Sequence, residues 1–310
     1  MTTPESAPTE REGISCVIPV YNEAEAVART VIDVEAALVD IGRPWEIVLV
    51  DDGSSDGSYQ AATESQTASA SASRIHVLRH EINRGYGAAI KTGLRAAANP
   101  WILIIDADGT YPPAEIAKLT TALDNAPSAD MIVGQRTQTL ATDGFFRLQG
   151  KRILMATANF LSGVKIPDLN SGLRLMRKQS LERYRPLLPD GFSLTTSITL
   201  ALLCSGGYVR YVPIDYLHRV GESKIRPVRD MTNFIALIAR TITYFNPLKV
   251  YIPLAVTLII LAILTIVLSK TFGGQVMDVT ALFLFVGGLQ MLLIGVVADL
   301  VLKLIGTREN

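Results

Sequence analysis

The chain contains little cysteine and histidine for its 310 residues. Its two cysteines, Cys16 and Cys204, exclude a disulfide framework and a multi-cysteine zinc site. Both lie among apolar residues, which predicts buried, reduced thiols. The histidines do not form a metal-binding set by their spacing: they are His76, His80 and His218.

The chain also has no excess of positive or negative side chains. Basic and acidic side chains number 29 each, so the formal net charge is zero. This balance argues against a nucleic-acid binder that works by bulk electrostatics, and we expect no nucleic-acid partner. The sequence has no Walker phosphate loop, and no Ser–His–Asp set is apparent from the spacing.

The first residues carry no apolar export segment. Residues 1–12 are rich in Thr, Pro, Ser and Glu, a composition typical of a disordered tail. We therefore expect the polar part of the chain to stay in the compartment where it is made, with nucleotides and reduced thiols.

Charged residues make up only 19% of the chain, and its apolar residues are concentrated at the C-terminus. Residues 251–268 and 280–298 are both long and apolar enough to approach the ~20 residues that a bilayer requires. Basic residues flank their outer ends, whereas the loop between them carries only Lys270. The positive-inside rule predicts a two-helix transmembrane hairpin over 249–310 in the cytoplasmic (inner) membrane, with the remaining chain facing the cytoplasm. A buried soluble helix is a weaker alternative.

Residues 231–248 form an amphipathic pattern just before the hairpin. This pattern predicts a helix in the membrane interface, and the alternative is a helix packed on the preceding domain. Within the hairpin, Gly287, Gly288 and Gly295 would let spans pack closely, which leaves room for a homo-oligomer.

Apolar strand-like runs alternate with helical patterns between residues 13 and 230. This alternation predicts an α/β domain with a mostly parallel sheet flanked by helices. Ligands of such sheets lie beyond the carboxyl ends of the strands. We expect strands over 14–20, 45–50, 75–78, 101–105, 131–133 and 208–213, and helices over 23–39, from 58, 88–98, 113–123, 151–161 and 193–205.

Acidic side chains follow two of these strands directly. Asp51 and Asp52 follow the second strand, and Asp106 and Asp108 follow the fourth, so all four are expected at one edge of the sheet. Hard divalent cations prefer carboxylate oxygens and often bridge protein to substrate phosphates. Asp106 and Asp108 are therefore predicted to bind Mg²⁺ or Mn²⁺, which would neutralise a diphosphate leaving group.

Three further turns have alternative interpretations. The turn at 19–23 could bind a base and a ribose, or simply join a strand to a helix. In the turn at 51–57, Asp52 is expected to contact the ligand, whereas Asp56 could cap the next helix. The glycine-rich turn at 83–88 resembles a phosphate loop but lacks the usual spacing, and the alternative is a tight turn with close backbone contacts.

Cations that could bind phosphates occur later in the chain: Arg136, Arg174, Arg219 and Lys224. For the cations of 219–229, the alternative is a generic positive cluster beside the membrane.

Six motifs follow one another in this order: VIPVYNE, DDGSSDGS, NRGYGAA, DADGTYPP, DLNSGLR and HRVGESK. Taken together, they resemble family 2 glycosyltransferases of the GT-A fold, in particular polyprenyl-phosphate (dolichyl- or undecaprenyl-phosphate) mannose and glucose synthases. The resemblance covers roughly residues 14–224 and implies a metal-dependent, inverting transfer of a hexose from a nucleotide sugar to a membrane polyprenyl phosphate. The donor would be of the UDP-glucose or GDP-mannose type.

The resemblance also implies roles for individual residues. Asp106 and Asp108 match the metal-binding acids, and Arg136, Arg219 and Lys224 match residues that bind phosphates. The nucleotide-binding positions are matched by Pro19, Tyr21, Glu23, Val50, Asp52 and Ala107. Two departures weaken a specific claim to mannose: Thr110 stands where some mannose synthases have glutamine, and Leu173 replaces the usual phenylalanine.

The chemistry explains why no strong general base is apparent. A polyprenyl phosphate is already an anion and needs charge screening rather than deprotonation. Asp168 is expected to orient the acceptor or a basic neighbour. The alternatives are a glycosyltransferase with another glycan or lipid acceptor and, from a different class, a non-catalytic membrane adaptor. A processive synthase is disfavoured because the Q-x-x-R-W motif is absent.

Overall fold

The computed structural model describes residues 12–137, 155–160, 162–217, 247–272 and 277–307. Of the expected disordered tail it describes only Glu12, and of the expected interfacial helix only the last two residues, which begin the first helix of the hairpin. The predicted helix over 151–161 is described at 155–160, where the chain is helical.

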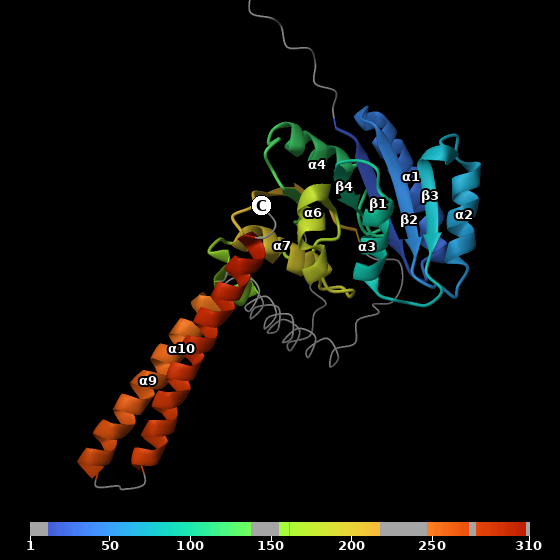
Figure 1. Ribbon diagram of the computed structural model, residues 1–310. Coiled ribbons are helices and arrows are strands. Elements are labelled where there is room, and N and C mark those ends of the chain that lie inside the picture. Colours follow the sequence, from blue (N-terminus) through green and yellow to red (C-terminus); the bar gives the residue numbers. More distant parts are fainter. Residues whose placement is uncertain (1–11, 138–154, 161, 218–246, 273–276, 308–310) are drawn as a thin grey trace, which may run out of the picture.

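A seven-stranded sheet forms the centre of the N-terminal domain, with strand order β3-β2-β1-β4-β6-β5-β7 (Figure 1). Only β6 is antiparallel to its neighbours, so the predicted mostly parallel sheet is confirmed. The strands are β1 (Ile14–Val20), β2 (Trp45–Asp51), β3 (Ile75–Arg79), β4 (Trp101–Ile104), β5 (Met131–Arg136), β6 (Arg174–Arg177) and β7 (Val209–Ile214).

Helices cover both faces of the sheet, which is why β1, β2 and β4 are buried along their whole length. One face packs against α1 (Ala24–Ile41), α2 (Ser58–Ala68) and α4 (Glu115–Asp124). The other packs against α3 (Tyr86–Ala96), α6 (Lys178–Tyr184) and α7 (Leu194–Cys204). Short 3₁₀ turns lie at Ala72–Arg74 and Arg185–Leu187.

Two elements, β6 and α6, have no counterpart among the strands and helices expected from the sequence. The four residues of β6 begin and end with arginine, so they lack the apolar run of the other strands. The strand nevertheless pairs with both β4 and β5 and is inserted between them in the antiparallel sense. Its place depends on strands that are distant in the sequence rather than on its own pattern.

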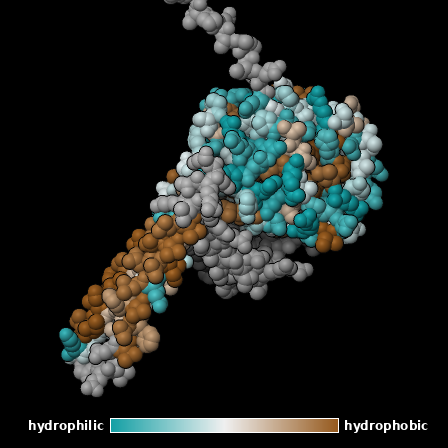
Figure 2. Space-filling model, in the orientation of Figure 1, coloured by the Kyte–Doolittle hydropathy of each residue, from teal (hydrophilic) through white to brown (hydrophobic). Residues whose placement is uncertain are grey.

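The C-terminal hairpin consists of α9 (Pro247–Phe272) and α10 (Met277–Thr307). The two helices lie side by side and extend away from the sheet (Figure 1), and their exposed surface is predominantly apolar (Figure 2). Both are long and apolar enough to cross a membrane. A β-carbon on Gly295 would lie 2.6 Å from Cβ of Tyr251, and one on Gly288 would lie 2.8 Å from Cγ1 of Ile259. These glycines therefore allow α9 and α10 to pack closely against each other.

Candidate active site

The carboxyl edge of the sheet gathers several of the residues predicted to bind a nucleotide. Pro19 is the direct strand neighbour of Val50, and both are buried. Ala107 follows β4 on the other side of β1, and its carbonyl oxygen accepts a hydrogen bond from Thr30 Oγ1 of α1 at 3.2 Å. Beyond these strand ends, the Tyr21 side chain is 38% exposed. The edge thus combines a floor of buried strand-end residues with an accessible aromatic ring.

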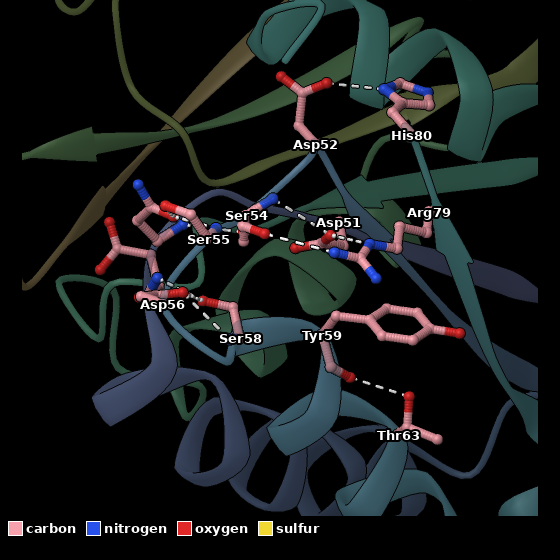
Figure 3. Close-up of polar contacts among 12 residues, drawn as sticks. Asp51, Asp52, Ser54, Ser55, Asp56, Ser58, Tyr59, Thr63, Arg79 and His80 are labelled. Atoms are coloured by element: carbon pink, nitrogen blue, oxygen red, sulfur yellow. Dashed lines mark hydrogen bonds and ion pairs between the residues drawn. The ribbon is translucent and has the colours of Figure 1, made fainter. Parts of the chain in front are cut away.

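Hydrogen bonds join the turn after β1 to the loop after β2 (Figure 3). The amide of Glu23 donates to Ser58 Oγ at 2.8 Å, and the amide of Ala24 donates to Asp56 Oδ2 at 3.1 Å. Asp56 Oδ1 also accepts from the Ser58 amide at 3.1 Å. Asp56 therefore serves the first turns of both α1 and α2, which agrees with the capping interpretation. The Glu23 side chain is half-buried beside this cap.

Asp52 is almost fully buried and accepts three hydrogen bonds from the protein. Its partners are Nδ1 of His80 at 2.6 Å (Figure 3) and the amides of Arg84 and Gly85 at 3.0 and 2.7 Å. His80 Nε2 lies 2.9 Å from Thr92 Oγ1 on α3. The carboxylate thus organises the turn before α3, and its contact with a ligand stays a prediction. Sequence spacing gave no signal for the role of His80.

The glycine-rich turn before α3 packs closely against the backbone of another loop. A β-carbon on Gly85, whose φ is +102°, would lie 2.5 Å from the carbonyl oxygen of Asp190. The Ala88 amide donates to that same oxygen at 3.1 Å. Since amides of this turn are bonded to protein, the structure favours the tight-turn interpretation over the phosphate loop.

The Asp51 side chain is buried and contacts neighbouring residues of the domain. It is 1% exposed, and its Oδ2 lies 3.3 Å from Nε of Arg79. The Arg79 guanidinium in turn lies 4.6 Å from the centre of the Tyr59 ring (Figure 3). These contacts tie the end of β2 to β3 and α2.

Asp106 and Asp108 lie half-buried just after β4, where each carboxylate is oriented by neighbours. Asp106 Oδ1 accepts from the hydroxyl of Tyr86 at 2.9 Å. Asp108 Oδ1 accepts from both the amide and the hydroxyl of Thr110, at 3.1 and 2.6 Å. Thr110, one of the two departures from the family pattern, therefore holds the second acid in place.

Two tyrosines border this pair of acids: Tyr86 is half-buried and Tyr111 is buried. Burial and the nearby Asp106 charge raise the pKa of Tyr86 well above its usual value, so its hydroxyl remains a donor at neutral pH. Burial likewise raises the pKa of Tyr111, whose hydroxyl accepts from the amide of Gly172 at 2.6 Å. The loop that contains Gly172 is thereby fixed against the acids.

Arg136 and Asp168 form a two-pronged ion pair. Nε and Nη2 of Arg136 donate to the two carboxylate oxygens at 2.8 and 2.9 Å. Burial alone would raise the pKa of Asp168, but the hydrogen bonds and charge of Arg136 outweigh it and hold that pKa below its ordinary value. The Arg136 guanidinium also lies 5.3 Å from the centre of the Tyr216 ring. Asp168 thus contacts a basic neighbour, which is one of the two roles expected for it from the sequence.

Arg174 is fully buried and bonds mainly to backbone carbonyls, a role that the sequence did not reveal. Its guanidinium donates to the carbonyl oxygens of Ser171 and Leu169 at 2.6 and 2.7 Å, and to Thr199 Oγ1 at 2.6 Å. Burial lowers its pKa. Arg174 therefore supports the turn between Asp168 and Gly172 instead of binding an exposed phosphate. The other expected phosphate-binding cations, Arg219 and Lys224, lie outside the described residues.

The acids at this edge fit a hard divalent cation. Within the described ranges, no group of three or more His, Cys, Asp and Glu side chains could bind a metal by itself. Magnesium is commonly bound through one or two carboxylates, with substrate phosphates and water completing its coordination. Asp106 and Asp108 supply such a pair in the turn just after β4.

Residues 15–185 match the family model described as glycosyl transferase family 2. The chain belongs to glycosyl transferase family 2. Residues 246–304 also match the model described as the GtrB C-terminal hairpin, which covers α9 and most of α10. The family resemblance inferred from the motifs is thereby confirmed.

Curated relatives match this glycosyltransferase over different shares of the chain. An undecaprenyl-phosphate 4-deoxy-4-formamido-L-arabinose transferase from Salmonella paratyphi A is 28% identical over 299 residues, which cover 91% of this chain and 86% of the relative. A transferase of the same name from Pectobacterium carotovorum is 34% identical over 169 residues, covering 54% of this chain and 49% of the relative.

Solved structures support the GT-A fold. Glucosyl-3-phosphoglycerate synthase from Mycobacterium tuberculosis superposes with a TM-score of 0.58 at 19% identity, covering 74% of this chain and 80% of the other. Mannosyl-3-phosphoglycerate synthase from Rubrobacter xylanophilus gives a TM-score of 0.55 at 18% identity, covering 74% and 72%. At these identities the likeness concerns the fold alone.

Proposed function

We propose that this glycosyltransferase moves a sugar from a nucleotide-sugar donor to a membrane polyprenyl phosphate by a single inverting displacement. The observation that carries the proposal is the match along 91% of the chain to a transferase named for undecaprenyl phosphate. Residues 246–304 also match the model of the GtrB C-terminal hairpin, and this apolar hairpin would keep the enzyme where a lipid acceptor is found.

The donor is proposed to bind at the carboxyl edge of the sheet. Pro19, Val50 and Ala107 would form the floor of the nucleotide site, and the exposed ring of Tyr21 would lie against the base. Glu23 and Asp52 are proposed to accept hydrogen bonds from ribose and base. The proposed sugar is a hexose carried on UDP or GDP, as the resemblance of the motifs to mannose and glucose synthases implies, whereas the relatives are named for a pentose derivative.

Asp106 and Asp108 are proposed to bind Mg²⁺ or Mn²⁺, which would offset the charge of the diphosphate as it leaves. The acceptor phosphate oxygen forms a bond to the anomeric carbon while the bond from that carbon to the diphosphate oxygen breaks. No proton has to move, because the acceptor is already an anion.

Arg136 is proposed to attract the acceptor phosphate, and Asp168 to hold the guanidinium fork in position through its two hydrogen bonds. Arg219 and Lys224 are proposed to add further positive charge. This charge would lower the repulsion between an anionic acceptor and an anionic donor.

The hairpin is proposed to cross the cytoplasmic membrane twice, with the catalytic domain on the cytoplasmic side. Basic residues at its outer ends, among them Lys249 and Lys303, support this orientation. Assembly into a homo-oligomer stays a separate proposal, which crosslinking in membranes would address.

The test is sugar transfer by the full chain in vesicles with Mg²⁺ or Mn²⁺, a polyprenyl phosphate and a panel of labelled nucleotide sugars. We expect one donor to give a lipid-phosphate sugar of inverted anomeric configuration, and Asp108→Ala to abolish transfer. Retained configuration would exclude the single displacement. Absence of transfer by protein that binds nucleotide sugar would point to the alternative acceptor, and absence of nucleotide-sugar binding to an adaptor.

A further inference from the structure

Phe160 and Val164 expose apolar side chains, although residues beside them are held by a hydrogen bond and a small core cluster. Phe160 and Val164 are 55% and 48% exposed. The Ile166 amide donates to Asn159 Oδ1 at 2.9 Å, and the Ile166 side chain is buried. Ala158 is buried in the same small core cluster. The exposed apolar groups therefore belong to an ordered surface.

The start of the hairpin lies against this surface. Nζ of Lys249, in the first turn of α9, lies 3.4 Å from the carbonyl oxygen of Phe160. A β-carbon on Gly163 would lie 3.7 Å from the same Nζ atom. Burial raises the pKa of Cys204 at the end of α7, and the charge of Lys249 offsets part of that rise. Lys249 thus joins the start of α9 to the chain at Phe160 and Gly163.

Lys249 also lies close to the point where the exposed apolar part of α9 begins. Ile252 is only three residues further along α9, a rise of about 4.5 Å. From Ile252 onward, apolar side chains of α9 are exposed and require lipid around them. Phe160 is therefore adjacent to the boundary between hydrocarbon and headgroups.

We propose that Phe160, Val164 and Lys165 form a membrane-docking edge of the catalytic domain, whose partner is the phospholipid leaflet around the hairpin. The two apolar side chains would enter the interfacial region. Lys165, which is exposed, and Lys249 would attract anionic headgroups. The edge continues the surface that the hairpin presents to lipid, so both would contact the same leaflet.

This edge deepens the proposed function, and the following consequence rests on it. Asp168 is three residues after Lys165, a span of at most about 11 Å of chain. Docking would therefore hold the Arg136–Asp168 pair close to the headgroups, where the phosphate of a polyprenyl lipid lies. The acceptor could reach the pair without leaving the membrane surface.

Tryptophan quenching tests the edge without any turnover. The full chain carrying Phe160→Trp or Val164→Trp is inserted in vesicles of phosphatidylcholine and phosphatidylglycerol, with and without brominated acyl chains. The matched control is Ile32→Trp, an apolar residue 59% exposed on α1, which lies away from the hairpin (Figure 1). Emission of the wild-type chain, from the buried Trp45 and Trp101, is subtracted.

Brominated lipid is expected to quench the added emission at 160 and 164 several-fold more than at 32. Equal quenching at all three positions, or none at 160 and 164, would overturn the docking edge. Because the readout needs neither donor nor acceptor, this result is independent of whether the proposed transfer occurs.

A second experiment tests the consequence for the acceptor. The double substitution Phe160→Glu, Val164→Glu is expected to lower transfer to a long-chain polyprenyl phosphate in vesicles several-fold. Transfer to a short, water-soluble prenyl phosphate in detergent should stay unchanged, which also shows that the variant folds. Equal losses with both acceptors, or no loss with either, would contradict the role of the edge, and Ile32→Glu serves as the control.

Discussion

Gly172 lies directly against the carboxylate of Asp106: a β-carbon at position 172 would come within 2.7 Å of Cγ of that residue. The two residues are distant in the sequence and are brought together because β6, which begins just after Gly172, pairs with β4, which ends just before Asp106. The close approach leaves the carboxylate little freedom to move.

We predict that Gly172→Ala displaces the Asp106 carboxylate and weakens metal-dependent nucleotide binding by about 10- to 100-fold, the range typical for disturbed support of a metal ligand. Calorimetric titration of the nucleotide with and without Mn²⁺ measures the effect. Gly191→Ala is the matched control, because a β-carbon there meets nothing within 4 Å. Unchanged binding in Gly172→Ala would contradict the close approach.

The Tyr86 hydroxyl orients the same acid through its 2.9 Å hydrogen bond to Oδ1. Tyr86→Phe keeps the ring and its stacking on Phe192 but removes that bond. We expect about 10- to 100-fold weaker Mn²⁺ binding, measured by electron paramagnetic resonance of free Mn²⁺, with little change in thermal stability. Tyr59→Phe, on α2 away from the acids, should bind Mn²⁺ like the wild type. Equal Mn²⁺ affinity in both variants would exclude the positioning role.

The depressed pKa of Asp168 predicts a pH dependence of stability. A carboxyl group whose pKa is lower in the folded than in the unfolded state stabilises the fold above the unfolded value of about 3.9, and this contribution is lost as the pH falls through the folded value. Wild-type protein should therefore melt at a higher temperature than Asp168→Asn at pH 6. The difference should shrink as the pH falls below about 4. Thermal unfolding in detergent over this range measures it, and a constant difference would show that the charge of Asp168 does not stabilise the fold.

The hairpin should tolerate a methyl group at Gly287 but not at Gly295. A β-carbon on Gly295 would lie 2.6 Å from Tyr251, whereas on Gly287 the nearest atom is 3.9 Å away on Leu258. We expect Gly295→Ala to destabilise the hairpin by about 1–3 kcal/mol through overpacking, and Gly287→Ala to have little effect. Thermal unfolding of the two full-length variants in the same detergent compares them. A larger loss in Gly287→Ala would instead indicate a contact outside the hairpin, such as a second copy of the chain.

Much of the fold follows from local sequence patterns. The apolar runs of β1, β2 and β4 predicted buried strands, because a parallel sheet covered on both faces needs apolar residues at every position. The long apolar stretches predicted the helices α9 and α10 for the same reason of burial, here in lipid. The placement of Asp106 at the functional edge followed from its position after a strand.

The detailed geometry of the site depends on contacts between distant residues. Asp52 is bound by His80 and the turn before α3, and Arg136 by Asp168, across separations that no local pattern encodes. The local pattern was sufficient to place Asp52 and Asp106 at the carboxyl edge, because each comes just after an apolar run long enough to be a buried strand. How the residues of the site pair depends on the tertiary structure, because the antiparallel insertion of β6 carries Gly172 to Asp106 and the buried Arg174 holds the preceding loop in place.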